Sequence, residues 1–133
     1  MLNKSQILEA ADLGFEEVEV PEWGGSVRVR MMTGSERDAF ETEIYEVKGD
    51  DVKFNRENFR ARLLVRTIAD EKNDRIFSDA DIQTLGKKSA KVLDRLFAVA
   101  QKLNGISAAD REEMIKNSGG GDGVSLSSTS AVS

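Results

Sequence analysis

The sequence predicts an α+β fold that is mainly α, in which one β-hairpin over about residues 15–32 packs with five or six helices. Two observations predict it. Apolar and charged residues alternate on both sides of a turn-forming segment, which is typical of two half-buried strands. Elsewhere apolar residues recur at spacings of three and four, which indicates helices with one buried face.

The length of 133 residues fits one domain followed by a tail. We predict a single globular domain over residues 1–117. Residues 118–133 read SGGGDGVSLSSTSAVS and hold too little apolar surface to offset the entropy cost of ordering, so they predict a flexible tail. That tail is either a terminus of no consequence or a linker or docking segment.

The first elements are a short helix and the hairpin. Ser5 is a candidate cap for a helix that ends near Gly14, with its apolar positions at Ile7, Leu8 and Ala11. The strands 18–20 and 27–31 flank a turn at 21–26. Placing Val20 opposite Val27 sets Glu19 against Arg28 and Glu17 against Arg30, which gives one apolar face and two cross-strand ion pairs.

Two longer helices are predicted next. Thr33 and Glu36 form a capping box for a helix that presents Phe40, Ile44 and Val47 and stops at Gly49, before a polar loop at 50–51. Asn55 is a plausible cap for a helix through about Ala69. Its wide apolar face predicts a central, well-buried helix and comprises Phe59, Leu63, Leu64, Val65 and Ile68.

The remaining elements follow from caps and turn residues. Residues 70–74 predict a turn, and Ser78 caps a brief helix through Leu85. A longer helix begins near Ser89 and ends at Asn104-Gly105. A last helix is expected from Ser107 to about Asn117.

The composition argues against an enzyme. The chain has no Cys or His, so it lacks a thiol nucleophile, the commonest general base and the commonest metal ligands. We therefore predict no catalytic residues, no cofactor and no metal site. The four aspartates Asp70, Asp74, Asp79 and Asp81, together with Asn73, could surround a cation, but turn and capping roles explain them better. No apolar run approaches a membrane span and no secretory leader begins the chain, so an intracellular, soluble domain is expected.

Charge is unevenly distributed along a chain whose net charge is -5. Acidic residues dominate positions 1–22, namely Glu9, Asp12, Glu16, Glu17, Glu19 and Glu22. Two basic segments follow, the first with Lys53, Arg56, Arg60, Arg62 and Arg66 and the second with Lys87, Lys88, Lys91 and Arg95. The basic segments fit a solvated or subunit-contact face better than phosphate binding. The asymmetry predicts either head-to-tail self-association into a ring or spiral or neutralisation within one chain.

Trp23, Met32 and Tyr45 are the candidate partner-binding residues. Trp23 stands beside two glycines in the hairpin turn, where the chain should be near the surface. An aromatic side chain there either anchors a partner or packs back onto a neighbouring helix.

The stretch VPEWGGSVRVRMMTGSERDAFE, residues 20–41, resembles the small tail-assembly chaperones of long-tailed bacteriophages in their short form. The resemblance extends to about residue 117. It implies a non-enzymatic protein of the infected host's cytoplasm that binds the tape-measure protein, keeps it soluble and helps recruit tail-tube subunits. It also implies absence from the finished virion, and it assigns no functional residues.

Two other functions remain open on the sequence. One is a structural head–tail connector or tail-terminator protein. The other, suggested by the two basic segments, is a small phage DNA-binding regulator, although nucleic acid is not the expected partner of an acidic chain.

Overall fold

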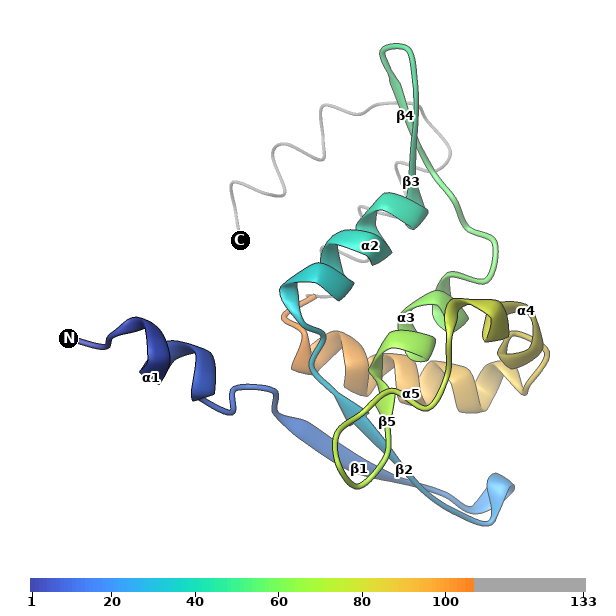
Figure 1. Cartoon of the computed structure of the whole chain (residues 1–133). Helices are drawn as coiled ribbons and strands as arrows, with labels where there is room; N and C mark the ends of the chain where they lie inside the picture. Colours follow the sequence, from blue (N-terminus) through green and yellow to red (C-terminus); the bar gives the residue numbers. More distant parts are fainter. Residues whose placement is uncertain (107–133) are drawn as a thin grey trace.

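The computed structural model describes residues 1–106 and has an α+β fold (Figure 1). The predicted last helix and the tail lie outside the described residues. Five α-helices, two 3₁₀ turns and two small antiparallel sheets make up the described part, in the order α1 (Lys4–Glu9), β1 (Phe15–Val20), η1 (Pro21–Trp23), β2 (Gly25–Arg30), α2 (Gly34–Ile44), β3 (Tyr45–Lys48), β4 (Asp51–Phe54), α3 (Phe59–Thr67), β5 (Ile68–Ala69), η2 (Asp79–Asp81), α4 (Ile82–Leu85) and α5 (Ala90–Leu103).

The predicted hairpin is confirmed, but its predicted register is wrong by two residues. Val20 pairs with Gly25 and Glu17 with Arg28, because a 3₁₀ turn closed by the left-handed Gly24 (φ 78°) connects the strands in four residues. A shift of two keeps each side chain on its predicted face. The ion pair that forms is Glu17–Arg28, at 3.0 Å.

The first sheet also has a strand that was not predicted. The helix expected to run through Ala69 ends at Thr67, and Ile68 and Ala69 pair with Val29 and Arg28 of β2 as strand β5. The sheet order is therefore β1-β2-β5.

The largest correction concerns residues 45–54. The helix α2 starts at the predicted Thr33–Glu36 capping box but ends at Ile44, five residues before the predicted stop. Residues 45–48 and 51–54 form a second hairpin whose turn contains Gly49 at φ 62°. The fold therefore has two hairpins where one was predicted.

Two helix starts also differ from prediction. The α1 helix is capped by Asn3, not Ser5, and ends at Glu9, well before Gly14. The α3 helix starts at Phe59, four residues after the predicted cap, because Asn55 instead accepts the Glu57 backbone N–H in a local turn, at 3.1 Å. The Ser78 and Ser89 caps and the Asn104-Gly105 end are confirmed.

The α3 helix lies at the centre of the core, as predicted, between α5, α4 and the first sheet. Its residues Leu63, Leu64 and Val65 are fully buried. The α5 helix packs against α3 and against β1 and β2. Figure 1 shows two parts that stand away from this body, namely α1 beyond the start of β1 and the β3–β4 hairpin beyond the end of α2.

Candidate functional site

Three surfaces of the described part combine apolar side chains with exposure. We name them the N-terminal arm (residues 1–12), the Trp23 pocket and the hairpin stripe, the latter two defined below. Among the described residues, five of the exposed large apolar side chains belong to the arm or to the β3–β4 hairpin. They are Met1, Leu2, Ile7, Leu8 and Val47.

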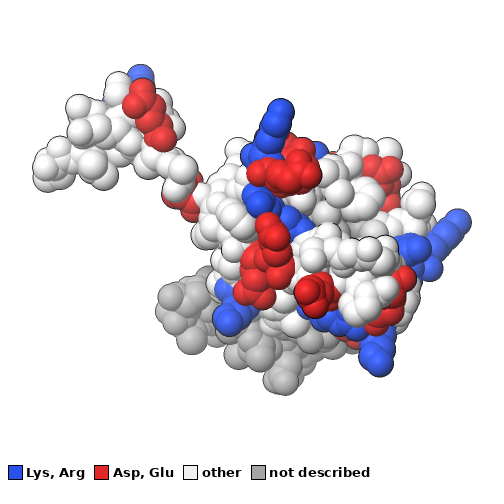
Figure 2. Space-filling model, turned by 90° about the horizontal axis from the view of Figure 1, so that it is seen from below, with Lys and Arg blue, Asp and Glu red and all other residues white. Residues whose placement is uncertain are grey.

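The N-terminal arm is exposed along its whole length. Ile7 is 57% exposed and Leu8 73% exposed, and no α1 residue is buried. The arm is tethered just after it ends, because the Asn73 side chain donates to the Leu13 carbonyl at 3.0 Å and the Met31 N–H donates to the Gly14 carbonyl at 2.9 Å. Figure 2 shows the arm projecting from the body.

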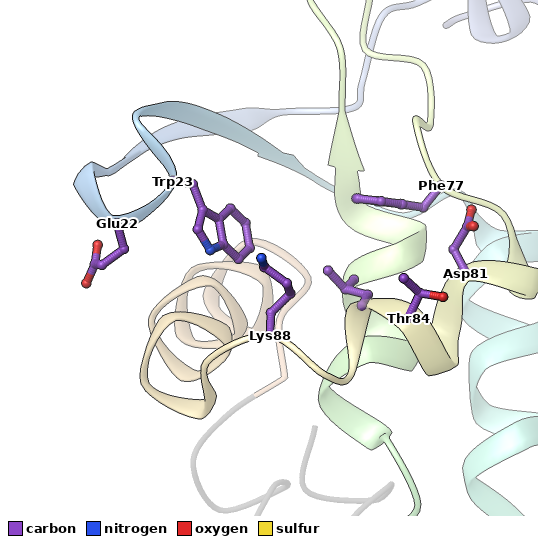
Figure 3. Close-up of a pocket in the computed structure, with 7 residues that line it drawn as sticks. Glu22, Trp23, Phe77, Asp81, Thr84 and Lys88 are labelled. Carbon is purple, nitrogen blue, oxygen red and sulfur yellow. The ribbon is translucent and has the colours of Figure 1, made fainter.

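The Trp23 pocket is a hollow of about 430 Å³ lined by Glu22, Trp23, Phe77, Asp81, Thr84, Leu85 and Lys88. Its apolar walls come from separate parts of the chain, since Trp23 follows β1, Phe77 precedes η2 and Leu85 ends α4. Figure 3 shows the indole of Trp23 next to the side chain of Lys88, with Phe77, Asp81 and Thr84 across the pocket. The Lys88 ammonium lies 5.7 Å from the indole centroid, within cation–π range.

An ion pair fixes the hairpin turn to α5 beside this pocket. Arg95 donates two hydrogen bonds to the carboxylate of Glu22, at 2.9 and 2.6 Å. The hydrogen bond from Arg95 is the main reason that the pKa of Glu22 is lowered from 4.5 to about 2. A lowered pKa in the folded state means that this pair stabilises the fold above about pH 4.5 and that the contribution is lost as the pH falls through about 2.

We therefore expect the fluorescence of Trp23, the single tryptophan, to remain native on acidification until the pH approaches about 2. In an Arg95→Gln variant the first change should move up toward the ordinary Glu pKa of 4.5, since Glu22 then lacks its main donor. Circular dichroism recorded in parallel separates this local change from global unfolding. Superimposable fluorescence titrations of the two proteins would show that the pair does not hold the turn.

The hairpin stripe is the apolar face shared by β3 and β4. Tyr45 opposes Phe54 and Val47 opposes Val52, so these four side chains lie on one face of the hairpin. The stripe runs from buried Phe54 through half-buried Tyr45 and Val52 to Val47, which is 68% exposed. Tyr45 meets Phe54 edge-on with ring centroids 6.1 Å apart. It is thus an apolar surface that begins in the core and ends in solvent.

Much of the predicted charge asymmetry is neutralised within the chain. Arg62 and Arg66 pair with Glu43, Arg60 with Asp94, and Arg95 with Glu22. Figure 2 shows acidic and basic side chains adjoining on one face. Within residues 1–106, no ion pair involves the acids Glu9, Asp12, Glu16 and Glu19 or the bases Lys53, Arg56, Lys87, Lys88 and Lys91.

The structure places the three predicted partner-binding residues apart. Trp23 is half-buried and packs back toward α4 and α5 as a wall of the pocket. Met32 is buried in the core at 7% exposure, and its N–H donates to the Asn104 side chain at 2.7 Å. Tyr45 is the first residue of β3 and belongs to the hairpin stripe. The β3–β4 hairpin lies on the other side of the body from the β1–β2 turn (Figure 1). The residues that sequence reasoning missed are Phe77, Leu85, Val47 and Val52.

Among residues 1–106, no three acidic side chains lie close enough together to hold a metal ion. Across the same residues, no helix is both long and apolar enough to pass through a lipid bilayer.

Comparison with known proteins gives the family. Residues 3–117 match the family model described as "Phage tail assembly chaperone". The fold is similar to the structure of the bacteriophage HK97 tail assembly chaperone, with a TM-score of 0.54 and 24% identity over 74% of this chain and 90% of that one. The comparison with curated proteins gives no match. Because the family model covers most of the sequence, this chain belongs to the phage tail assembly chaperones, a non-enzymatic family.

Proposed function

We propose that this chaperone binds the tape-measure protein of a phage tail, keeps it soluble and helps recruit tail-tube subunits. It acts in the cytoplasm of the infected bacterium and does not remain in the mature virion. The observation that carries this proposal is the family match over residues 3–117, because tail-assembly chaperones act on proteins of the growing tail.

The hairpin stripe is the surface that we assign to the tape-measure protein. A chaperone for long apolar helices needs an apolar surface that is exposed to solvent and is also anchored to the folded core. The stripe meets both needs, since Phe54 is buried while Val47 is exposed at the far end of a projecting hairpin. Tyr45 lies opposite Phe54 at the base of the stripe and contacts the client there.

We assign Trp23 and Met32 a different role from Tyr45, because the β1–β2 turn that carries Trp23 and the β3–β4 hairpin lie on opposite sides of the body (Figure 1). Trp23 contacts a second copy of the chain. Met32 has a supporting role within the core at the other end of the β1–β2 hairpin, where its N–H donates to the Asn104 side chain. Self-association uses charge as well. Four acids of the first 22 residues and three lysines before and within α5 form no ion pair among residues 1–106, namely Glu9, Asp12, Glu16, Glu19, Lys87, Lys88 and Lys91. The expected assembly is a ring or spiral of weakly bound copies.

Co-expression with a tape-measure protein tests the client role. The chaperone should raise the soluble fraction of the tape-measure protein and be recovered with it. A Val47→Ser variant should weaken the complex roughly tenfold or more, since a buried Val side chain contributes about 1.5–3 kcal/mol. The matched control is Glu46→Ser, which makes the same replacement on the opposite face of the same strand.

Two outcomes would count against this function. A tape-measure protein that is equally soluble without the chaperone would remove the client role. Abundant peptides of this chain in purified mature virions would instead favour a structural connector or tail-terminator protein.

A further inference from the structure

The N-terminal arm contains a helix, α1, whose sequence has helix-starting signals. No other segment of the described residues buries this helix. Asn3 and Gln6 form a reciprocal capping box, and Leu2 and Ile7 occupy the positions of a hydrophobic staple. A six-residue helix is nevertheless far below the roughly 12–15 residues at which isolated helices become stable. The arm therefore needs a docking surface.

The arm cannot reach the Trp23 pocket of its own chain while its tether holds. Leu13 and Gly14 are fixed at the start of β1, and Trp23 lies beyond the end of this strand. Six strand residues rise about 20 Å, whereas the four residues from Leu13 back to Glu9 span at most about 14 Å and the helical residues as far as Ile7 add only about 3 Å. Figure 1 shows α1 and the β1–β2 turn at opposite ends of the hairpin.

The Trp23 pocket offers what the arm lacks. Its walls are Trp23, Phe77 and Leu85, and its volume of about 430 Å³ accommodates aliphatic side chains. Lys88 is on its rim, and Lys87 and Lys91 lie next to it in the sequence. None of the three lysines forms an ion pair among residues 1–106, and the same is true of Glu9 and Asp12 at the end of the arm. The pocket lining also holds two carboxylates, Asp81 and Glu22, of which Glu22 is paired with Arg95 and also interacts with Lys91.

We propose that Ile7 and Leu8 of one copy insert into the Trp23 pocket of a second copy, with Glu9 and Asp12 facing the lysines of its rim. This inference rests on the self-association proposed above and assigns the two surfaces that make it. Arm and pocket are different surfaces, so each copy gives one arm and receives another. A contact of this kind is heterologous and produces rings or open spirals.

Two variants test the arm and the pocket independently. Ile7→Ser combined with Leu8→Ser breaks the arm, and Thr84→Tyr fills the pocket from an exposed position on α4. Each should weaken self-association about 100-fold in sedimentation equilibrium, which corresponds to about 2.8 kcal/mol at 1.4 kcal/mol per tenfold. Ile76→Ser is the matched control, because Ile76 has nearly the same exposure as Ile7, 55% against 57%, and does not line the pocket. It should associate like the original protein.

Mixing gives the decisive result. The arm variant keeps a working pocket and the pocket variant keeps a working arm, so an equimolar mixture should form a one-to-one dimer and nothing larger. The dimer should weaken as salt is added. It should also change the Trp23 fluorescence of the arm variant.

The failures are distinguishable. If the original protein is strictly monomeric at high concentration and low salt, both self-association and this inference fail, and the co-expression result still stands. If the original protein and both variants associate equally, the inference alone fails. If Thr84→Tyr leaves association unchanged but prevents recovery of the tape-measure protein, the pocket belongs to the client and the inference is overturned.

Discussion

Replacing Phe54 with Ala should lower the free energy of unfolding by about 3–5 kcal/mol, the usual range for a buried Phe. Phe54 is 6% exposed. Its ring meets that of Phe59 edge-on with 5.7 Å between centroids, and Phe59 in turn meets Phe97 edge-on with 5.3 Å between centroids. These contacts fasten the β3–β4 hairpin to α3 and α5. Denaturant unfolding followed by circular dichroism measures the loss.

A Phe54→Leu variant is the control for volume. It keeps most of the buried apolar surface and loses the ring contacts, so we expect a loss of only about 1–2 kcal/mol. A loss below about 1 kcal/mol for Phe54→Ala would mean that the hairpin does not depend on the core. In that event the hairpin stripe would not be the fixed client surface that we propose.

The second large effect is expected at Glu43. Its carboxylate accepts hydrogen bonds from Arg66, at 2.5 and 3.3 Å, and from Arg62, at 3.1 Å. Arg66 is only 1% exposed, so its charge has little access to water. A Glu43→Gln variant should lose about 3 kcal/mol of stability, near the lower end for breaking a buried ion pair, because Asp79 remains 3.6 Å from Arg66.

The matched control for Glu43→Gln is Glu46→Gln. Glu46 pairs with Lys48 at 3.4 Å on the surface, and loss of such a pair should cost less than about 1 kcal/mol. Combining Glu43→Leu with Arg66→Met should recover part of the stability, because no unpaired charge is then buried at that position. Equal losses in Glu43→Gln and Glu46→Gln would contradict a structural role for the buried pair.

Local signals predicted much of the fold. The caps at Thr33, Ser78 and Ser89 and the end at Asn104-Gly105 depend on hydrogen bonds within a few residues, and the structure has all of them. The hairpin register depended on the length of the turn. Gly24 and Gly25 suit either a long or a short turn, so the charge pattern selected a register two residues from the one observed.

The second hairpin was missed because two periods coincide. Phe40, Ile44 and Val47 have helical spacing, while Tyr45–Lys48 and Asp51–Phe54 each alternate apolar and polar residues around Gly49. The alternation was the signal that could have found Val47 and Val52. Sequence periodicity could not predict that Glu43 pairs with Arg66, because Glu43 belongs to another helix. The spacing of Arg62 and Arg66 indicated a solvated helix face instead.

The candidate site depended still more on tertiary structure. Trp23 was identified as a turn residue, but the walls of its pocket come from positions 77 and 85, far along the chain. Met32 and Tyr45 follow the ends of β2 and α2, and only packing decides that one is buried and the other half-buried. A periodic pattern cannot bring such distant segments together.

The exposure of the arm has a practical consequence for handling the protein. Met1 is fully exposed and Leu2 follows it, so an affinity tag fused ahead of them would lie directly beside Ile7 and Leu8. Such a tag would compete with the proposed docking of α1, so on that proposal it should shift a purified sample toward single copies in sedimentation. Enzymatic removal of the tag should therefore restore larger species.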